Sequence, residues 1–208
     1  TEWGTRIAIG WQPTDNLDIQ LSYRHNELAN GGNVYTTATE RPDGSAIYRR
    51  TIELNTDVEN RKSVDGIIFS LAYDMGPVAF TNVTSYTRRK VNFAWDLDYS
   101  AADAVVAFNG DRNTAKVFTQ ELRLASTGTG DFDWLVGAYY SSVADRGITN
   151  NADLYLGPDA GGPIFIPDFN NGDSNEKQYA LFGTANYRVG DFRIGAGVRV
   201  GRVGFKGT

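Results

Sequence analysis

Hydrophobic and polar residues alternate with a period of two along much of this chain. The clearest example is residues 192–204, where Phe192, Ile194, Val198 and Val200 alternate with arginine and glycine. Successive side chains of a β-strand point to opposite faces, so this pattern predicts a strand with one apolar face and one polar face. By the same criterion we expect eight strands, at about residues 5–12, 17–25, 63–75, 77–93, 115–126, 132–145, 176–189 and 192–204.

The expected strands are long, and the connections between them alternate in length. Strands of soluble sheets typically have about 5 to 6 residues, whereas a tilted strand that crosses a bilayer needs about 9 to 11. Short turns are expected at residues 13–16, 74–77, 127–131 and 190–191, and long polar loops at about 26–61, 94–114 and 146–175. Loops of this length are uncommon inside a compact soluble domain. Short turns at one end and long loops at the other are typical of outer-membrane β-barrels.

Aromatic residues fall into two groups that fit this layout. Barrels in membranes carry a girdle of aromatic side chains at each interface between lipid and water. The group near the short turns comprises Trp11, Tyr73, Phe80, Phe132, Trp134, Tyr187 and Phe192, and the group near the long loops comprises Tyr23, Tyr86, Phe93, Phe118 and Tyr179. The fold class predicted is therefore all-β, an antiparallel meander of about eight long strands that forms part of a transmembrane β-barrel.

Composition narrows the range of functions. Twenty Lys and Arg residues against 25 Asp and Glu residues give a net charge of −5, whereas nucleic-acid proteins carry a basic patch or stripe, so we expect no nucleic-acid partner. The chain has no cysteine and a single histidine, so the common zinc sites cannot form and we expect no metal site and no cofactor. A catalytic triad could be built only around His25, and we do not expect an enzyme.

Five charged residues within the expected strands are candidates for the inner surface of a barrel. A charge on the lipid face near the midplane costs about 2 to 4 kcal/mol, so charges in strands should face the lumen. Such residues either form salt bridges across strands in a hydrated interior or line a polar transport path. The predicted lumen-facing residues are Arg24, Glu121, Arg123, Arg193 and Arg199.

Candidate ligand-binding residues lie at the end expected to carry the long loops. His25 ends the second strand, and the loop of residues 94–114 contains Trp95, Asp98 and Tyr99. Binding residues concentrate on loops above rigid scaffolds, which favours ligand contact. The alternative for all four residues is an ordinary solvated surface.

Four stretches resemble the barrel of TonB-dependent outer-membrane receptors. They read "FTNVTSYTRR" at 80–89, "TQELRLAS" at 119–126, "FDWLVGAYY" at 132–140 and "YALFGTANYRVGDFRIGAGVR" at 179–199. The resemblance implies a barrel of about 22 strands in the outer membrane. It also implies uptake of a scarce nutrient such as a ferric siderophore, cobalamin or an oligosaccharide. The energy would come from an inner-membrane complex that acts on a plug domain outside these residues.

The direction of the strands bears on how much of a barrel is present. If the short turns are periplasmic, the first strand starts and the eighth strand ends on the extracellular side, which predicts an internal segment of a larger barrel, residues 1–208. The expected partners are then outer-membrane lipid and a small-molecule nutrient. Two alternatives remain open at this point: a small closed eight-stranded outer-membrane barrel with a structural or adhesion role, and a soluble β-sandwich.

Overall fold

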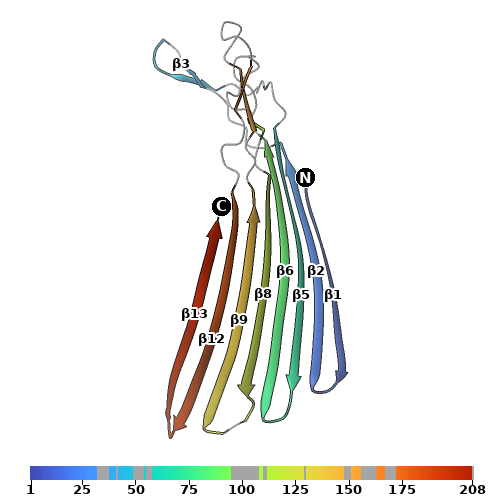
Figure 1. The fold of residues 1–208 in the computed structure, drawn as a ribbon, viewed down its shortest axis with the longest axis vertical. Coiled ribbons are helices and arrows are strands. Elements are labelled where there is room, and N and C mark those ends of the chain that lie inside the picture. Colours follow the sequence, from blue (N-terminus) through green and yellow to red (C-terminus); the bar gives the residue numbers. More distant parts are fainter. Residues whose placement is uncertain are drawn as a thin grey trace.

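Eight long strands form one antiparallel sheet, and each pairs with its neighbours along the chain in the order β1-β2-β5-β6-β8-β9-β12-β13 (Figure 1). The computed structural model describes residues 1–31, 38–40, 42–48, 54, 58–94, 108–109, 112–128, 130–147, 151–155, 163–166 and 172–207. The strands are β1 (Glu2–Thr14), β2 (Leu17–Asn30), β5 (Glu59–Asp74), β6 (Val78–Ala94), β8 (Arg112–Ser126), β9 (Phe132–Arg146), β12 (Asp173–Val189) and β13 (Phe192–Gly207). The predicted antiparallel meander of eight long strands is confirmed.

The strands extend further toward the long loops than the sequence pattern predicts. β2 continues to Asn30 and β5 begins at Glu59, so their pairing covers part of the segment expected to be a loop. Residues 26–30 and 59–62 are mostly polar on both faces, which removes the alternation on which the prediction depends. The backbone ladder continues nevertheless, because hydrogen bonding between strands does not require an apolar face.

Short strands also occur within the segments predicted as loops. β3 (Ala38–Glu40) pairs with β4 (Ala46–Tyr48) in a hairpin. β10 (Asn151–Tyr155) pairs with both β7 (Phe108–Asn109) and β11 (Pro163–Ile166), so two predicted loops join in one small sheet. These strands are too short for periodicity to reveal.

Two of the short turns depend on glycine. Gly190, between β12 and β13, has a φ of 57°, and Gly76, between β5 and β6, has a φ of 88°. Residues with a Cβ rarely adopt this left-handed region, whereas glycine adopts it without steric cost. At the second turn, the side chain of Asp74 accepts a hydrogen bond of 2.8 Å from the backbone N–H of Gly76.

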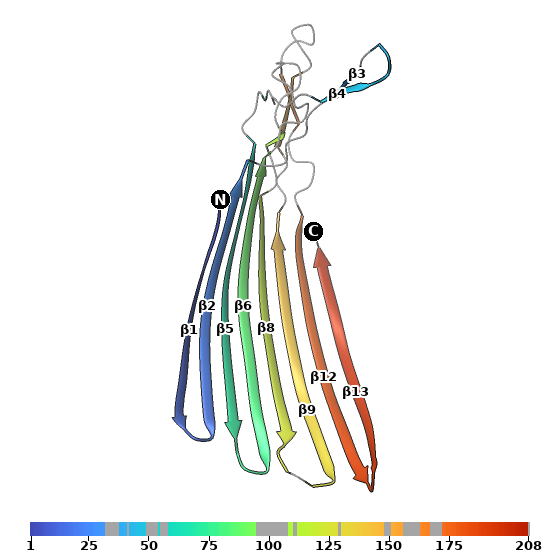
Figure 2. The ribbon, with the colours of Figure 1, turned by 180° about the vertical axis from the view of Figure 1, so that it is seen from behind.

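The short turns descend in steps across the sheet. One row of paired residues runs through Leu17 of β2, Tyr73, Phe80, Leu124, Val136, Gly183 and Val198. β2 begins at this row, whereas β12 continues past Gly183 to Val189 before it turns. Figures 1 and 2 show the resulting slope of the turns from both sides. The line of turns is therefore inclined to the strands and not perpendicular to them. Closed barrels have this stagger, because their strands are tilted relative to the barrel axis.

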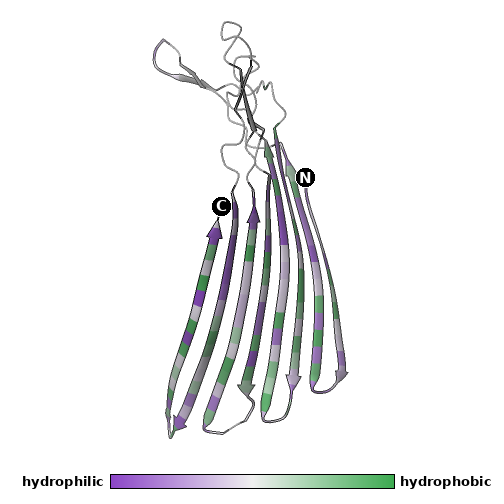
Figure 3. Cartoon of the chain, viewed as in Figure 1, coloured by the Kyte–Doolittle hydropathy of each residue, from purple (hydrophilic) through white to green (hydrophobic). Residues whose placement is uncertain are grey.

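The sheet has one apolar face and one polar face, and among the described residues no second layer covers it. The apolar face includes Leu21, Phe69, Ile194 and Val198, which the strand register places on the same side. Leu21, Ile194 and Val198 are 45%, 66% and 67% exposed. Alternating bands of hydropathy along β13 are visible in Figure 3. A two-layer sandwich would bury these side chains, so that alternative is wrong for the described residues.

The eight strands do not close into a small barrel. Within the described residues, β1 pairs only with β2 and β13 only with β12, so both remain edge strands. Both labelled chain ends lie at the end of the sheet that carries the long loops, as strand direction predicted (Figure 1). No helix among the described residues has the length and apolar character needed to cross a membrane.

The predicted aromatic groups lie on the apolar face, with one correction. All seven residues near the short turns are on this face, as are Tyr23, Tyr86, Phe118 and Tyr179. Phe93 was predicted in the same group, but it lies on the polar face because an odd number of positions separates it from Tyr86. Tyr140, which lies beside Tyr179 on the apolar face, belongs to the upper row but was not in the predicted group.

Candidate functional site

The polar face brings together the charged residues that the sequence singled out. Arg24 lies between Tyr23 and His25 on β2, and Arg193 and Arg199 alternate with the apolar residues of β13. Glu121 and Arg123 alternate with the leucines of β8 in the same way. The register places these five residues on one side of the sheet, opposite Leu21 and Val198.

Two ion pairs lie on this face. Arg123 Nε donates to Glu121 Oε1 along β8. Arg193 Nη2 of β13 donates to Asp133 Oδ2 of β9 at 2.9 Å and reaches across β12. The side chains of this second pair are 58% and 40% exposed, so the pair contributes little to stability in water. The pair neutralises the charge of Arg193 locally on the polar face.

A cation and two aromatic rings meet on the polar face of β9, β12 and β13, near one edge of the sheet. The guanidinium carbon of Arg199 lies 5.5 Å from the ring centroid of Tyr139 and 5.6 Å from that of Phe182. These distances are within the range of cation–π attraction. The ring of Phe182 covers Gly137, where an added Cβ would overlap it. The group therefore offers one positive charge and two aromatic surfaces to a ligand.

Toward the long loops, polar side chains connect three neighbouring strands. Arg89 Nη2 of β6 donates to Asn113 Oδ1 of β8 at 3.2 Å, and Asn113 Nδ2 donates to Asp145 Oδ1 of β9 at 2.6 Å. The Oγ atom of Ser85 and the Oγ1 atom of Thr119 are hydrogen-bonded at 2.7 Å. Hydrogen-bonding groups thus continue from the ion pairs near the short turns to the end that carries the long loops.

His25 lies on the other side of the sheet from these groups. Its Nδ1 donates to Asp65 Oδ1 at 2.7 Å, and the hydroxyl of Tyr23 donates to the same oxygen at 2.9 Å. The ring of Trp3 lies 4.7 Å from the imidazole, centroid to centroid, and the histidine side chain is only 20% exposed. His25 is thus held in a polar cluster on the apolar face, next to the upper aromatic row. Its role in ligand binding stays a prediction.

The other three candidate ligand-binding residues, Trp95, Asp98 and Tyr99, lie outside the residues that the structure describes. Within the described part of the chain, no group of three or more His, Asp or Glu side chains is arranged to hold a metal ion.

Sequence reasoning missed the partners of the charged residues. Asp133, Tyr139 and Phe182 on the polar face and Asp65 on the apolar face were not singled out. For the two rings a signal was present, because Tyr139 is followed by Tyr140 and Phe182 is preceded by Leu181. Where two bulky residues are adjacent in a strand, one must point to the polar face.

No family model matches the chain, and no curated protein matches it significantly. Solved structures do match. The ferric yersiniabactin uptake receptor FyuA from Yersinia pestis superposes with a TM-score of 0.70 and 15% identity, over 100% of this chain and 31% of the receptor. The siderophore receptor PiuA from Acinetobacter baumannii superposes with a TM-score of 0.57 and 12% identity, over 99% of this chain and 39% of the receptor. The chain thus spans well under half the length of either receptor and has the fold of an outer-membrane barrel wall, which confirms the predicted fold.

Proposed function

We propose that this chain forms part of the wall of an outer-membrane receptor that takes up a small-molecule nutrient of the siderophore class in the TonB-dependent manner. The main support is the difference between the two faces of a sheet whose fold matches siderophore receptors over its whole length. The apolar face, with its aromatic rows, contacts lipid, and the polar face, with Arg24, Glu121, Arg123, Arg193 and Arg199, lines the lumen. No residue carries out covalent chemistry.

The polar face suits the passage of an anionic or aromatic chelate. Arg199 with Tyr139 and Phe182 presents a cation beside two rings, and such a group attracts both carboxylates and aromatic ligand groups. The ion pair of Arg193 with Asp133 is solvated, so its partners can exchange for ligand contacts at small cost. Import itself depends on an inner-membrane energising complex that acts through a plug domain.

Uptake by the full protein tests this proposal. The protein is produced in a Gram-negative host that lacks its own siderophore receptors, and accumulation of ⁵⁵Fe is measured with a panel of ferric hydroxamates, catecholates and phenolates. Labelled cobalamin and maltooligosaccharides serve as the other nutrient classes. We expect uptake of one ferric chelate that stops when the energising complex is deleted.

The control separates failed assembly from failed transport. Outer-membrane fractions are assayed for a folded barrel by the change in electrophoretic mobility on heating. A folded barrel that raises the uptake of no ferric chelate would contradict the siderophore proposal, and uptake of cobalamin or an oligosaccharide instead would replace it.

A further inference from the structure

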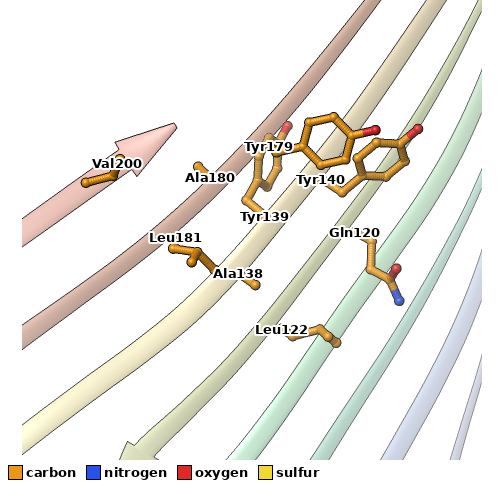
Figure 4. Close-up of a pocket in the computed structure, with 9 residues that line it drawn as sticks. All are labelled: Gln120, Leu122, Ala138, Tyr139, Tyr140, Tyr179, Ala180, Leu181 and Val200. Atoms are coloured by element: carbon orange, nitrogen blue, oxygen red, sulfur yellow. The ribbon is translucent and has the colours of Figure 1, made fainter. Parts of the chain in front are cut away.

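Three adjoining hollows run along β9, β12 and β13 on the apolar face. The lowest of these three has a volume of about 670 Å³, with Leu124, Val136, Leu181 and Val198 among its lining. The middle hollow, of about 320 Å³, is lined by Leu122, Ala138, Tyr140, Tyr179, Leu181 and Val200 among others (Figure 4). The third, of about 410 Å³, includes Tyr179, Lys177, Arg202 and Lys206. Because neighbouring hollows share residues, they form one continuous groove.

Small residues create the lower part of this groove. Ala138 lies in a row between Leu122 and Leu181, and Gly183 lies between Val136 and Val198. Each small side chain leaves a depression between two larger apolar ones. From Gly183 to Tyr179 the strand rises about 13 Å, close to the roughly 15 Å depth of one leaflet of a bilayer core. The depression therefore has the length and the apolar lining that suit one acyl chain.

Aromatic rings mark the upper limit of the apolar part. The rings of Tyr140 and Tyr179 are 4.9 Å apart between centroids and inclined at 40°, and Phe118 lies 5.9 Å from Tyr140. Figure 4 shows the two tyrosine rings side by side above Ala138 and Leu181. Tyrosine prefers the interface where acyl chains meet headgroups, so this row sets the expected headgroup level.

Positive charge lies beside and above the tyrosines, with Arg202 opposite Tyr179 and Lys177 two residues further along β12. Lys177, Arg202 and Lys206 are exposed on the same face, and Lys116 of β8 and Arg88 of β6 lie at the level of Lys206 beyond β9. Among the described residues, none of these five takes part in an ion pair. The chain as a whole carries a net charge of −5, so this concentration of basic residues runs against its composition.

We propose that this groove binds a phosphate-bearing membrane lipid, with an acyl chain along Ala138 and Gly183 and the phosphate between Lys177 and Arg202. The order apolar, aromatic, basic along the groove matches the order acyl chain, interface, phosphate in such a lipid. Arginine binds phosphate oxygens in a bidentate manner, and lysine supplies a second charge. The inference rests on the proposed membrane location but not on any transported nutrient.

Electron paramagnetic resonance of spin-labelled lipids tests the groove. The full protein is reconstituted in phosphatidylcholine vesicles that contain a small fraction of spin-labelled phosphatidic acid or spin-labelled phosphatidylcholine. The fraction of motionally restricted label gives the relative association of each lipid with the protein. We expect phosphatidic acid to associate roughly 25 times more strongly than phosphatidylcholine, because Lys177 and Arg202 each contribute about a factor of five.

Three variants separate the groove from general attraction to charge. Lys177→Gln combined with Arg202→Gln should reduce the preference for phosphatidic acid to nearly one. Lys62→Gln is the matched control, because Lys62 lies toward the same end of the sheet but on the polar face, and it should leave the preference unchanged. Ala138→Phe, which fills the floor of the groove, should lower the association of phosphatidic acid while the basic residues remain.

The outcomes also distinguish this inference from the proposed function. If the protein restricts phosphatidylcholine as strongly as phosphatidic acid, the groove proposal is wrong and the membrane barrel still stands. The same holds if the preference for phosphatidic acid falls equally in the Lys62 control and in the double variant. Unchanged association in the Ala138 variant would overturn the acyl-chain part of the proposal. If neither lipid is motionally restricted by a folded protein, the membrane location itself is wrong.

Discussion

Leu122 and Val83 form a matched pair of positions on opposite faces of the sheet. Leu122 lies on the apolar face between the aromatic rows, and Val83 lies on the polar face directly opposite Glu121. Their exposed fractions in the isolated sheet are 37% and 40%, so exposure alone predicts similar effects of a lysine at either position. The cost of a lysine should differ between the two positions only if one face contacts hydrocarbon and the other contacts water.

The expected cost of Leu122→Lys follows from its depth. A lysine on the lipid face near the midplane costs about 2 to 4 kcal/mol, which reduces the folding equilibrium constant roughly 30- to 700-fold. Val83→Lys should cost less than about 1 kcal/mol, because the new ammonium remains hydrated and lies opposite the carboxylate of Glu121. The difference between the two variants should therefore exceed about 1 kcal/mol.

Equilibrium folding into phospholipid vesicles measures this difference. The full protein and both variants are titrated with urea in the presence of vesicles, and the folded fraction is followed by tryptophan fluorescence and by heat-dependent mobility. Equal destabilisation by the two lysines, or greater destabilisation by the lysine at position 83, would refute the assignment of the faces.

Two further predictions concern the polar face. Gly137→Val should destabilise the folded protein by about 1 to 3 kcal/mol in the same assay, because the valine side chain would overlap the ring of Phe182. Gly10→Val is the control and should be nearly neutral, since no atom lies within 4 Å of a Cβ at that position. Equal effects of the two valines would contradict the crowding at Gly137. Arg193→Ala should cost at most about 1 kcal/mol, because its pair with Asp133 is solvated, and a larger loss would mean that the pair is shielded from water.

The fold was accessible from the sequence because each long strand repeats the same two-residue pattern. β13 shows this most clearly, with five apolar residues from Phe192 to Val200 in strict alternation. β6 was ambiguous, because Asn82 and Thr84 share the apolar face with Phe80 and Tyr86. The strand register resolves this, since pairing with β5 and β8 determines the face of every residue, and such long-range pairing is absent from the local pattern.

The candidate site was predicted only in part, for a similar reason. Arg193 and Arg199 could be assigned to a face from alternation alone. Their contacts with Asp133, Tyr139 and Phe182 involve other strands, so they depend on the register across β9 and β12. The small sheet formed by β7, β10 and β11 was missed because its strands have few residues and no neighbouring strand is implied by the local sequence.

The central claim is that alternate residues of a strand face lipid and water. The chain has no cysteine, so single cysteines that carry a nitroxide spin label can be placed along β13 of the full protein in vesicles. Relaxation by oxygen, which concentrates in lipid, is then compared with relaxation by a water-soluble nickel chelate at Ile194, Val198, Val200, Arg193 and Arg199. The account predicts high oxygen and low nickel accessibility at the first three positions and the reverse at the two arginines. Equal accessibility to nickel at all five positions, or no alternation between neighbours, would contradict it.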